Sequence, residues 1–436
     1  PAWVAGAAAT LLGADALRRR RLRPVALVAG THPTFAVFVL ALGVVVAAVA
    51  QGPLGSLVAD LVPGDDGLGS LLLLALIGTL AIPLAWLLAR RLAPPEDPGL
   101  SGLLAAVIVA FYPCLIADAG MLLTEALAGT LVIGALLTML RARDRLSQPG
   151  SWLLRGIEWL IPGLLLGLCA MVRPEYLAVS LLLIAAMVLV SRRQGLGRAL
   201  AGAAVMVAAI VLVIAPWTTR NLDETGRLVP LSTGGGQTLF TGSYLDSAGD
   251  PLEVMPHVLE NNPVLAQRIA IENARSGEGR ESITPERVLG LLASSRMPGV
   301  PTDLALARMG RENYLEALSN EPVRLAGFLA GKTARIWWRG RTDLTGTPAG
   351  RAFHMTLVAA ALGGLLLLGF RRRPEFWLIL ALCVSVTLIG ALFVASPRRT
   401  LVLWPVIASL SGLGCALAFR LARDAVASRL KPVPIA

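Results

Sequence analysis

The sequence predicts an all-α polytopic membrane protein, with about 10 transmembrane helices and an inserted extracytoplasmic domain. Of its 436 residues, 55% are hydrophobic and only 15% are charged, whereas an ordinary soluble domain carries roughly 25% charged residues. The mean hydropathy is +0.69. Several apolar runs reach the roughly 20 residues that a helix needs to cross a bilayer. This composition excludes a disordered chain, a collagen-like fibre and a small disulfide-stapled secreted domain.

The net charge of +11 is distributed unevenly along the chain. Residues 217–350 contain 14 Lys and Arg against 15 Asp and Glu, and the rest of the chain contains 25 against 13. The basic excess therefore lies in the short segments that flank the apolar runs, as in the cytoplasmic loops of membrane proteins. The charge pattern predicts a lipid bilayer as partner and gives no reason to expect nucleic-acid binding.

Ten apolar runs are interpreted as transmembrane helices. They cover residues 24–50, 68–89, 100–117, 119–140, 152–172, 176–190, 199–216, 352–370, 376–395 and 401–419. If the Arg-rich ends of these runs lie in the cytoplasm, successive spans alternate in direction. No cleavable signal peptide is evident, and the Ala-, Arg- and Gly-rich composition is typical of a GC-rich bacterium. We therefore expect a multi-pass protein of a bacterial cytoplasmic (inner) membrane, with its large loop on the extracytoplasmic side.

The expected spans divide the chain into three segments. Residues 1–216 form an N-terminal transmembrane bundle of about seven spans, and residues 351–436 form a C-terminal bundle of about three spans. Between them, residues 217–350 are too rich in Pro, Gly and charge to span a membrane, and we expect a mostly helical extracytoplasmic domain there. The chain begins at Pro1 without Met, which leaves open a truncation of the first bundle.

Charged side chains at the outer ends of the spans are the candidate functional residues, because charges in or near lipid are costly. Glu125 starts the fourth span, where it either stabilises a helix N-terminus or acts as a general base beside a membrane-embedded cleft. Arg173 and Glu175 join the fifth and sixth spans around Pro174. They either pin a tight turn or offer a cation to a phosphate.

Three further groups lie at expected outer ends or in the first span. Arg220 and Asn221 close the seventh span, where they either cap the helix C-terminus or face a ligand. Arg398 and Arg399 precede the last span on the side that basic residues normally avoid. An anionic partner such as a lipid phosphate explains them better. His32, in or beside the first apolar run, is either structural or a ligand. No metal-binding motif is present, so we expect no cofactor, although a divalent cation stays open.

Five motifs in a fixed order carry a resemblance to a known family. They are Leu87-Leu-Ala-Arg-Arg, Tyr112-Pro with Glu125, Arg173-Pro-Glu, Pro216-Trp-Thr-Thr-Arg-Asn, and Pro397-Arg-Arg with Trp404-Pro405. Over about residues 68 to 420, this pattern resembles the GT-C superfamily of integral-membrane glycosyltransferases. The similar branch is that of the protein O-mannosyltransferases and bacterial aminoarabinose transferases.

The resemblance implies an enzyme that moves a sugar from a polyprenyl-phosphate donor to a lipid, glycan or protein acceptor outside the cytoplasm. It places Glu125 as an acid at the outer start of a later span. It implies that Arg173, Arg220 and Arg398 face the donor phosphate or the acceptor. One general base and a single displacement would invert the anomeric centre.

The chain departs from the family in its first loop, which normally carries a catalytic acid before a Pro-Pro element. His32 and Pro33 resemble a degraded form of that element, and Asp15 is the acid upstream of it. Asp15 is therefore the candidate for the first catalytic acid. Truncation of the chain, divergence of the loop and loss of activity remain open explanations. A transporter or lipid flippase, and a non-catalytic membrane protein of the same fold, are the rival functions.

Overall fold

A computed structural model describes residues 68–95, 98–121, 123–148, 152–247, 249–276, 284–338 and 340–429. Regular structure in these ranges is entirely helical. Asp15, His32 and the first expected span lie outside them, so their predicted roles stay predictions. The chain divides into two compact units. The membrane unit consists of the described residues up to Arg220, Gly340–Val384 and the chain from Leu401, and the inserted unit consists of Asn221–Arg339 and Ser385–Thr400.

Six helical stretches of the described chain are long and apolar enough to cross a membrane. They are Leu74–Leu92, which includes α6 (Ala81–Leu92), α9 (Glu125–Asp144), α11 (Tyr176–Thr225), α19 (Pro348–Phe370), α20 (Pro374–Leu392) and Trp404–Val426 of α22 (Trp404–Arg429). A bent pair, α7 (Pro98–Phe111) and α8 (Pro113–Ala119), adds a seventh if its 52° bend lies within one span. Within its described part, the chain is the all-α polytopic membrane protein that the sequence predicts.

The length of α11 exceeds what one span requires. Its 50 residues would extend about 75 Å at 1.5 Å per residue, more than twice the thickness of a bilayer core. The helix is broken at Gly195, where φ is 136° and ψ is 99°, in the basic stretch between the two expected spans. The second half continues to Thr225. The interpretation that Arg220 and Asn221 cap a helix C-terminus is therefore wrong, because both lie inside the last turns of α11.

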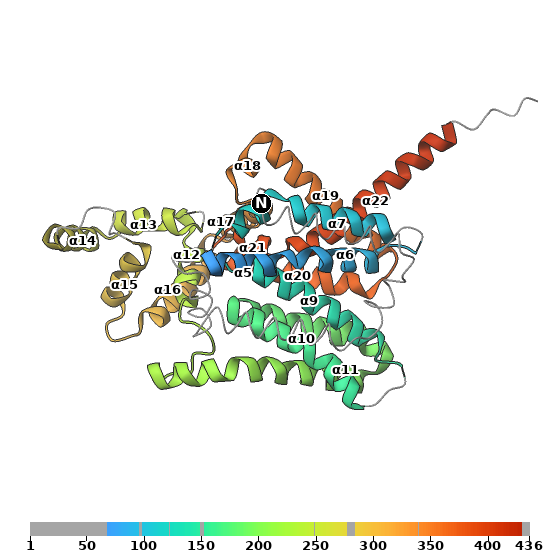
Figure 1. Ribbon diagram of the computed structural model, residues 1–436. Helices are drawn as coiled ribbons and strands as arrows, with labels where there is room; N and C mark the ends of the chain where they lie inside the picture. Colours follow the sequence, from blue (N-terminus) through green and yellow to red (C-terminus); the bar gives the residue numbers. More distant parts are fainter. Residues whose placement is uncertain are drawn as a thin grey trace, which may run out of the picture. The chain divides into compact units, whose positions relative to one another are not determined.

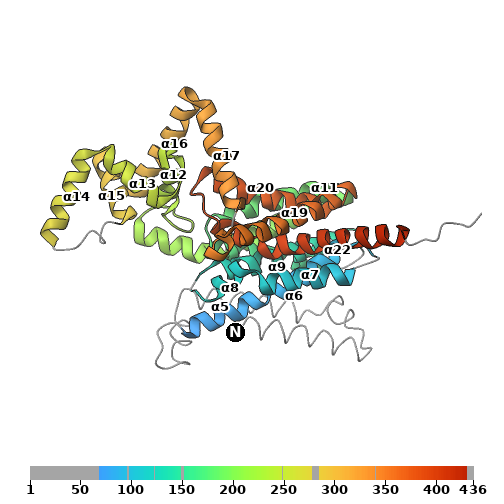
Figure 2. The same ribbon diagram turned by 90° about the horizontal axis from the view of Figure 1, so that it is seen from above.

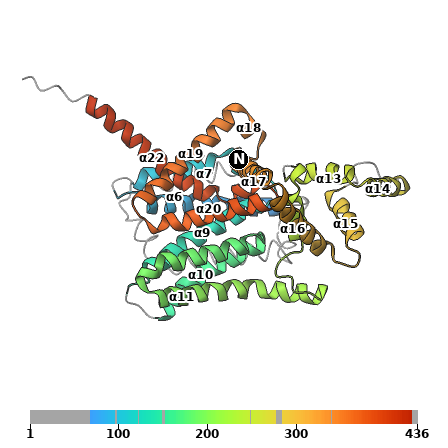
Figure 3. The same ribbon diagram turned by 180° about the vertical axis from the view of Figure 1, so that it is seen from behind.

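Small residues allow the helices of the membrane unit to pack closely. α10 (Trp152–Val172) lies between α9 and α11 (Figure 1). A Cβ atom on Gly163 would lie 2.7 Å from the Met206 backbone and from the Cβ of Ala209. α22 packs against α6, α7 and α19 (Figure 3). There the Ser409 hydroxyl donates to the carbonyl of Ala85 at 3.1 Å.

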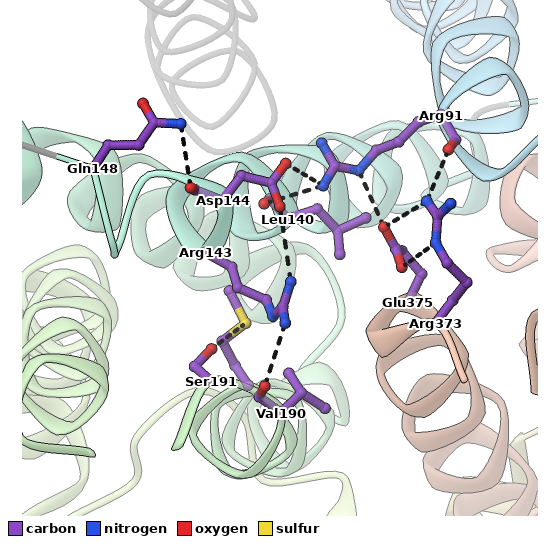
Figure 4. Close-up of polar contacts among 10 residues, drawn as sticks. Arg91, Leu140, Arg143, Asp144, Gln148, Val190, Ser191, Arg373 and Glu375 are labelled. Carbon is purple, nitrogen blue, oxygen red and sulfur yellow. Dashed lines mark hydrogen bonds and ion pairs between the residues drawn. The ribbon is translucent and has the colours of Figure 1, made fainter. Parts of the chain in front are cut away.

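A network of ion pairs joins several helices at the other end of α9 from Glu125 (Figure 4). Arg91 pairs with Asp144 at 2.5 Å and with Glu375 at 3.7 Å. Arg373 pairs with Glu375 at 3.1 Å, and Arg143 donates to the carbonyl of Val190 at 3.5 Å. Because the 20 residues of α9 extend about 30 Å, this network and Glu125 lie at opposite ends of a transmembrane span.

The inserted unit is a small helical assembly with its own apolar core. Its helices are α12 (Gly235–Ser243), α13 (Pro251–Glu260), α14 (Pro263–Ser276), α15 (Pro285–Arg296), α16 (Thr302–Asn320) and α17 (Pro322–Trp338). Their core gathers Phe240, Val254, Val288, Leu292 and Leu306. α16 and α17 form a helical hairpin (Figure 2). The sequence did not predict that residues 385–400, at the end of an apolar span, belong to this unit.

Candidate active site at the Glu125 end of the bundle

The structure brings together three of the residues singled out from the sequence: Glu125, Arg173 and Glu175. The Nη1 atom of Arg173 lies 3.2 Å from Oε1 of Glu125. Its Nη2 and Nε atoms lie 2.9 Å and 3.0 Å from Oε1 of Glu175. The Glu125 side chain is fully buried, and those of Arg173 and Glu175 are 14% and 24% exposed.

Local structure explains how the cluster forms. α9 begins at Glu125 and α10 ends at Val172, so the two helix ends place Glu125 and Arg173 on the same side of the bundle. The amide of Arg173 still donates to the carbonyl of Cys169 at 2.8 Å, and the amide of Tyr176 closes the turn onto the Arg173 carbonyl at 2.9 Å. Arg173 thus supplies the counter-charge that a buried carboxylate needs.

A small pocket of about 220 Å³, which includes space open to solvent, adjoins Glu125. The other residues that line it are small or apolar: Gly78, Ala81, Leu115, Ala126, Gly129, Leu401 and Pro405. Glu125 is therefore the charged group of an otherwise apolar wall. The enclosed part of this recess has room for about one water molecule. The recess therefore gives the Glu125 carboxylate a small apolar space beside it, and an ionised carboxylate in such a place can accept a proton.

A second ion pair, which was not predicted from the sequence, lies on α8, the helix that precedes α9. Nη1 of Arg341 lies 3.2 Å from Oδ1 of Asp118, whose side chain is fully buried. The Arg341 amide also donates to Sγ of Cys114 at 3.3 Å. Asp118 stands seven residues before Glu125 in the same polar stretch, and that proximity was the available signal. Its partner could not be foreseen, because Arg341 lies more than 200 positions further along the chain.

An aromatic cluster stands next to this ion pair. The Tyr112 hydroxyl lies 2.7 Å from Nδ1 of His354, and the Tyr112 and Trp404 rings stack with centroids 3.7 Å apart. All three side chains are buried. Tyr112 and Trp404 belong to the motifs of the family resemblance, and the structure gives both a packing role.

Arg220 and Asn221 have different surroundings. Arg220 is exposed, and its guanidinium carbon lies 4.8 Å from the centre of the Trp217 ring. The Asn221 side-chain amide donates to the carbonyls of Val229 and Leu231 at 3.0 and 3.2 Å. The Asn221 side chain therefore anchors the segment that follows α11. The Arg220 side chain is exposed to solvent, as a ligand-binding side chain must be.

Arg398 and Arg399 lie in the inserted unit, at the start of the short helix α21 (Arg398–Leu401). The Arg399 Nε atom donates to the carbonyl of Val394 at 2.8 Å, and the Arg398 amide donates to the Ser396 hydroxyl at 3.3 Å. Both side chains are partly exposed. Over the described residues, no group of three or more His, Cys, Asp or Glu side chains is arranged to hold a metal ion.

Comparison with known proteins gives similarities of structure alone. No family model and no curated protein matches the sequence. Among solved structures, the Archaeoglobus fulgidus oligosaccharyltransferase AglB in complex with an inhibitory peptide and a dolichol-phosphate is similar at 15% identity and a TM-score of 0.47. The match covers 87% of this chain and 43% of that one. The apo form of the Archaeoglobus fulgidus oligosaccharyltransferase is similar at 17% identity and a TM-score of 0.48, over 88% of this chain and 44% of that one. This chain spans less than half the length of these proteins.

Proposed function

We propose that this protein is a membrane glycosyltransferase of the GT-C type. In this proposal it transfers a sugar from a polyprenyl-phosphate donor to a lipid, glycan or protein acceptor on the extracytoplasmic side. The observation that carries the proposal is the buried Glu125 carboxylate, held by Arg173 beside an apolar pocket at one end of a transmembrane bundle. A base next to an apolar recess suits a reaction between a lipid-linked donor and an acceptor hydroxyl or amide.

The proposed chemistry is a single displacement. Glu125 takes the proton from the acceptor as its nucleophilic atom attacks the anomeric carbon, and the bond from that carbon to the phosphate oxygen breaks. The polyprenyl phosphate leaves with the bonding electrons, so its charge must be stabilised by fixed cations. One displacement inverts the anomeric configuration. We include no cofactor, and an assay with and without EDTA tests for a divalent cation.

For Arg173 we propose a different role from the one that the resemblance implies. Its Nε and Nη2 atoms lie within 3.0 Å of Glu175, and its Nη1 atom lies 3.2 Å from Glu125 without a hydrogen bond to any described residue. We therefore assign Arg173 to pairing with and orienting Glu125, and Glu175 to fixing Arg173. The family resemblance assigns the donor phosphate to Arg398 and Arg399, whose side chains are partly exposed. Arg220 is exposed and keeps its expected role toward the donor phosphate or the acceptor.

The test is sugar transfer by the purified protein in nanodiscs, with a panel of polyprenyl-phosphate sugars as donors. Glu125→Gln removes the base and should lower turnover by roughly 10²- to 10⁴-fold. Glu158→Gln is the matched control, because Glu158 pairs with Arg145 toward the opposite end of α9, and it should leave turnover unchanged. Equal turnover of wild type and Glu125→Gln would refute the assignment of the base.

A transporter or flippase is the second candidate, and the bend between α7 and α8 favours it because transporters use interrupted helices at their binding sites. Movement of the intact lipid-linked sugar across a vesicle membrane, without sugar release, would support this alternative.

A further inference from the structure

The inserted unit contains a buried lysine that the proposed transfer does not use. Lys332, in α17, is only 1% exposed. Its Nζ atom lies 2.6 Å from the carbonyl oxygen of Gly242, 3.4 Å from the Tyr314 hydroxyl and 5.0 Å from the centre of the Phe328 ring. Removing an ammonium group from water is costly, so these polar contacts must account for its position.

The contacts form a relay of hydrogen bonds. The Tyr314 hydroxyl lies 2.8 Å from the carbonyl of Gly242 and 2.6 Å from the carbonyl of Leu392. A tyrosine hydroxyl has a single proton, so it can donate fully to only one of two carbonyls. Lys332 donates to Gly242 and to the tyrosine oxygen, and this leaves the proton of Tyr314 for Leu392.

The carbonyl of Leu392 needs this donor for a structural reason. Leu392 is the last residue of α20, and the last carbonyls of a helix have no partner within the helix. Immediately afterwards the chain runs against α12, since a Cβ atom on Gly242 would lie 2.5 Å from the carbonyl carbon of Phe393. The relay therefore fixes the point at which residues 393–400 leave α20.

The far end of this segment is fixed on α17. The Thr400 hydroxyl lies 3.0 Å from the carbonyl oxygens of both Ile336 and Pro397, so its single proton is shared between α17 and the segment itself. Within the segment, the Arg399 side chain donates to the carbonyl of Val394. The charge of Arg399 also acts on Lys332. Burial, followed by the positive charges of Arg399 and Arg335, lowers the pKa of Lys332 to about 7. Lys332 and Arg399 are thus coupled through charge, and hydrogen bonds hold both ends of the segment that carries Arg399.

We propose that Lys332 and Tyr314 are positioning residues for Arg398 and Arg399. The relay from Gly242 through Lys332 and Tyr314 to Leu392 anchors residues 393–400 and holds the two arginines in the geometry that binds the donor phosphate. This inference rests on the proposed function, because it gives the arginines their ligand.

Tyr314→Phe tests the proposal by removing one hydroxyl from a ring that stays in place. The matched control is Tyr244→Phe, which loses a hydroxyl that accepts from Asn261 at 2.8 Å elsewhere in the inserted unit. We expect Tyr314→Phe to speed amide hydrogen exchange in residues 393–400 and to leave α15 as protected as in the wild type. We also expect its KM for the donor to rise roughly 2- to 10-fold, the equivalent of one hydrogen bond, with kcat nearly unchanged. The control should change neither quantity.

Lys332→Met is the second variant, because methionine keeps most of the apolar stem and removes the donor. It should give the same local exchange and the same rise in KM as Tyr314→Phe, and Arg398→Ala should raise KM at least as much. Unchanged exchange in residues 393–400 in both variants would overturn the proposal, and so would equal loosening of α15. A normal KM in both variants, when Arg398→Ala raises it, would also overturn it. If the wild type transfers no sugar, the proposed function fails, and hydrogen exchange alone decides whether the relay holds the segment.

Discussion

At the scale of single residues, Glu125 depends on its counter-charge. A carboxylate with no exposed surface, at the end of a transmembrane helix, is stable in its ionised form only if a cation and hydrogen bonds replace water. The sequence predicted Glu125, Arg173 and Glu175 as candidates, because each is a charge beside an apolar run. It could not predict that Arg173 would form ion pairs with both carboxylates, since this depends on how α9 and α10 are rotated about their axes.

Replacement of Arg173 by Met should therefore strongly destabilise the folded protein. It leaves Glu125 and Glu175 as neighbouring negative charges without Arg173 between them, and we expect a loss of about 3–5 kcal/mol in stability. Thermal unfolding in detergent measures the effect. The double variant Arg173→Met with Glu125→Gln should regain part of the stability and none of the turnover. An Arg173→Met variant that unfolds at the wild-type temperature would contradict the ion-pair interpretation.

Because of Lys332, we expect the free energy of unfolding to increase with pH above about pH 7. Its pKa is lowered to about 7 by burial and by Arg399 and Arg335, and Tyr314 faces it from α16. Between pH 7 and the ordinary lysine range the unfolded chain binds a proton that the folded chain does not. The contribution of Lys332 to stability therefore rises with pH over that window, by at most about 1.4 kcal/mol per pH unit. Unfolding of the full chain at pH 6.5 and pH 9 should show this rise, and Lys332→Met should remove it. An identical pH slope in wild type and variant would refute this role.

At the scale of elements, the sequence predicted where helices start and stop better than how they pack. The basic stretch between residues 190 and 199 correctly separated two spans, and the structure breaks α11 at Gly195. The end of α20 was not predictable. Residues 376–395 contain no charged residue. Contacts with distant parts of the chain, such as those of Thr387, Leu392 and Phe393, assign that end to the inserted unit.

Because α10 packs closely on α11, we expect two glycines of α10 to differ in how much stability is lost when each is replaced by alanine. A Cβ atom on Gly163 would meet the Met206 backbone at 2.7 Å, whereas one on Gly156 would meet nothing within 4 Å. We expect Gly163→Ala to cost about 1–3 kcal/mol through overpacking. Gly156→Ala should be neutral or slightly stabilising, because alanine favours a helix. Thermal unfolding of the two variants in parallel makes the comparison, and equal stability would show that the helices do not approach this closely.

At the scale of the whole molecule, the two ends of the bundle differ in chemistry. One end carries Glu125 with Arg173, and the other carries the network around Arg91 and Glu375. The sequence predicted this sidedness from charge alone, because arginine-rich loops recur at alternate ends of the apolar runs. We propose that the Glu125 end faces out of the cytoplasm, which is the side where an acceptor outside the cell would be met.

Cysteine labelling of intact cells tests this orientation. In a chain whose own cysteines are replaced, Ser319→Cys in the inserted unit should react with a membrane-impermeant maleimide added outside. Arg193→Cys, near the break in α11, should react only after permeabilisation. The reverse pattern would place the inserted unit in the cytoplasm and contradict the predicted topology.

The role of Glu125 is tested most simply by measuring the release of sugar from a polyprenyl-phosphate donor by wild type and Glu125→Gln in the same nanodiscs. We expect release by the wild type, a loss of at least 100-fold in Glu125→Gln because a general base is removed, and unaltered release by Glu158→Gln. Release that survives the loss of the Glu125 carboxylate, or no release from any donor that the wild type binds, would contradict this role.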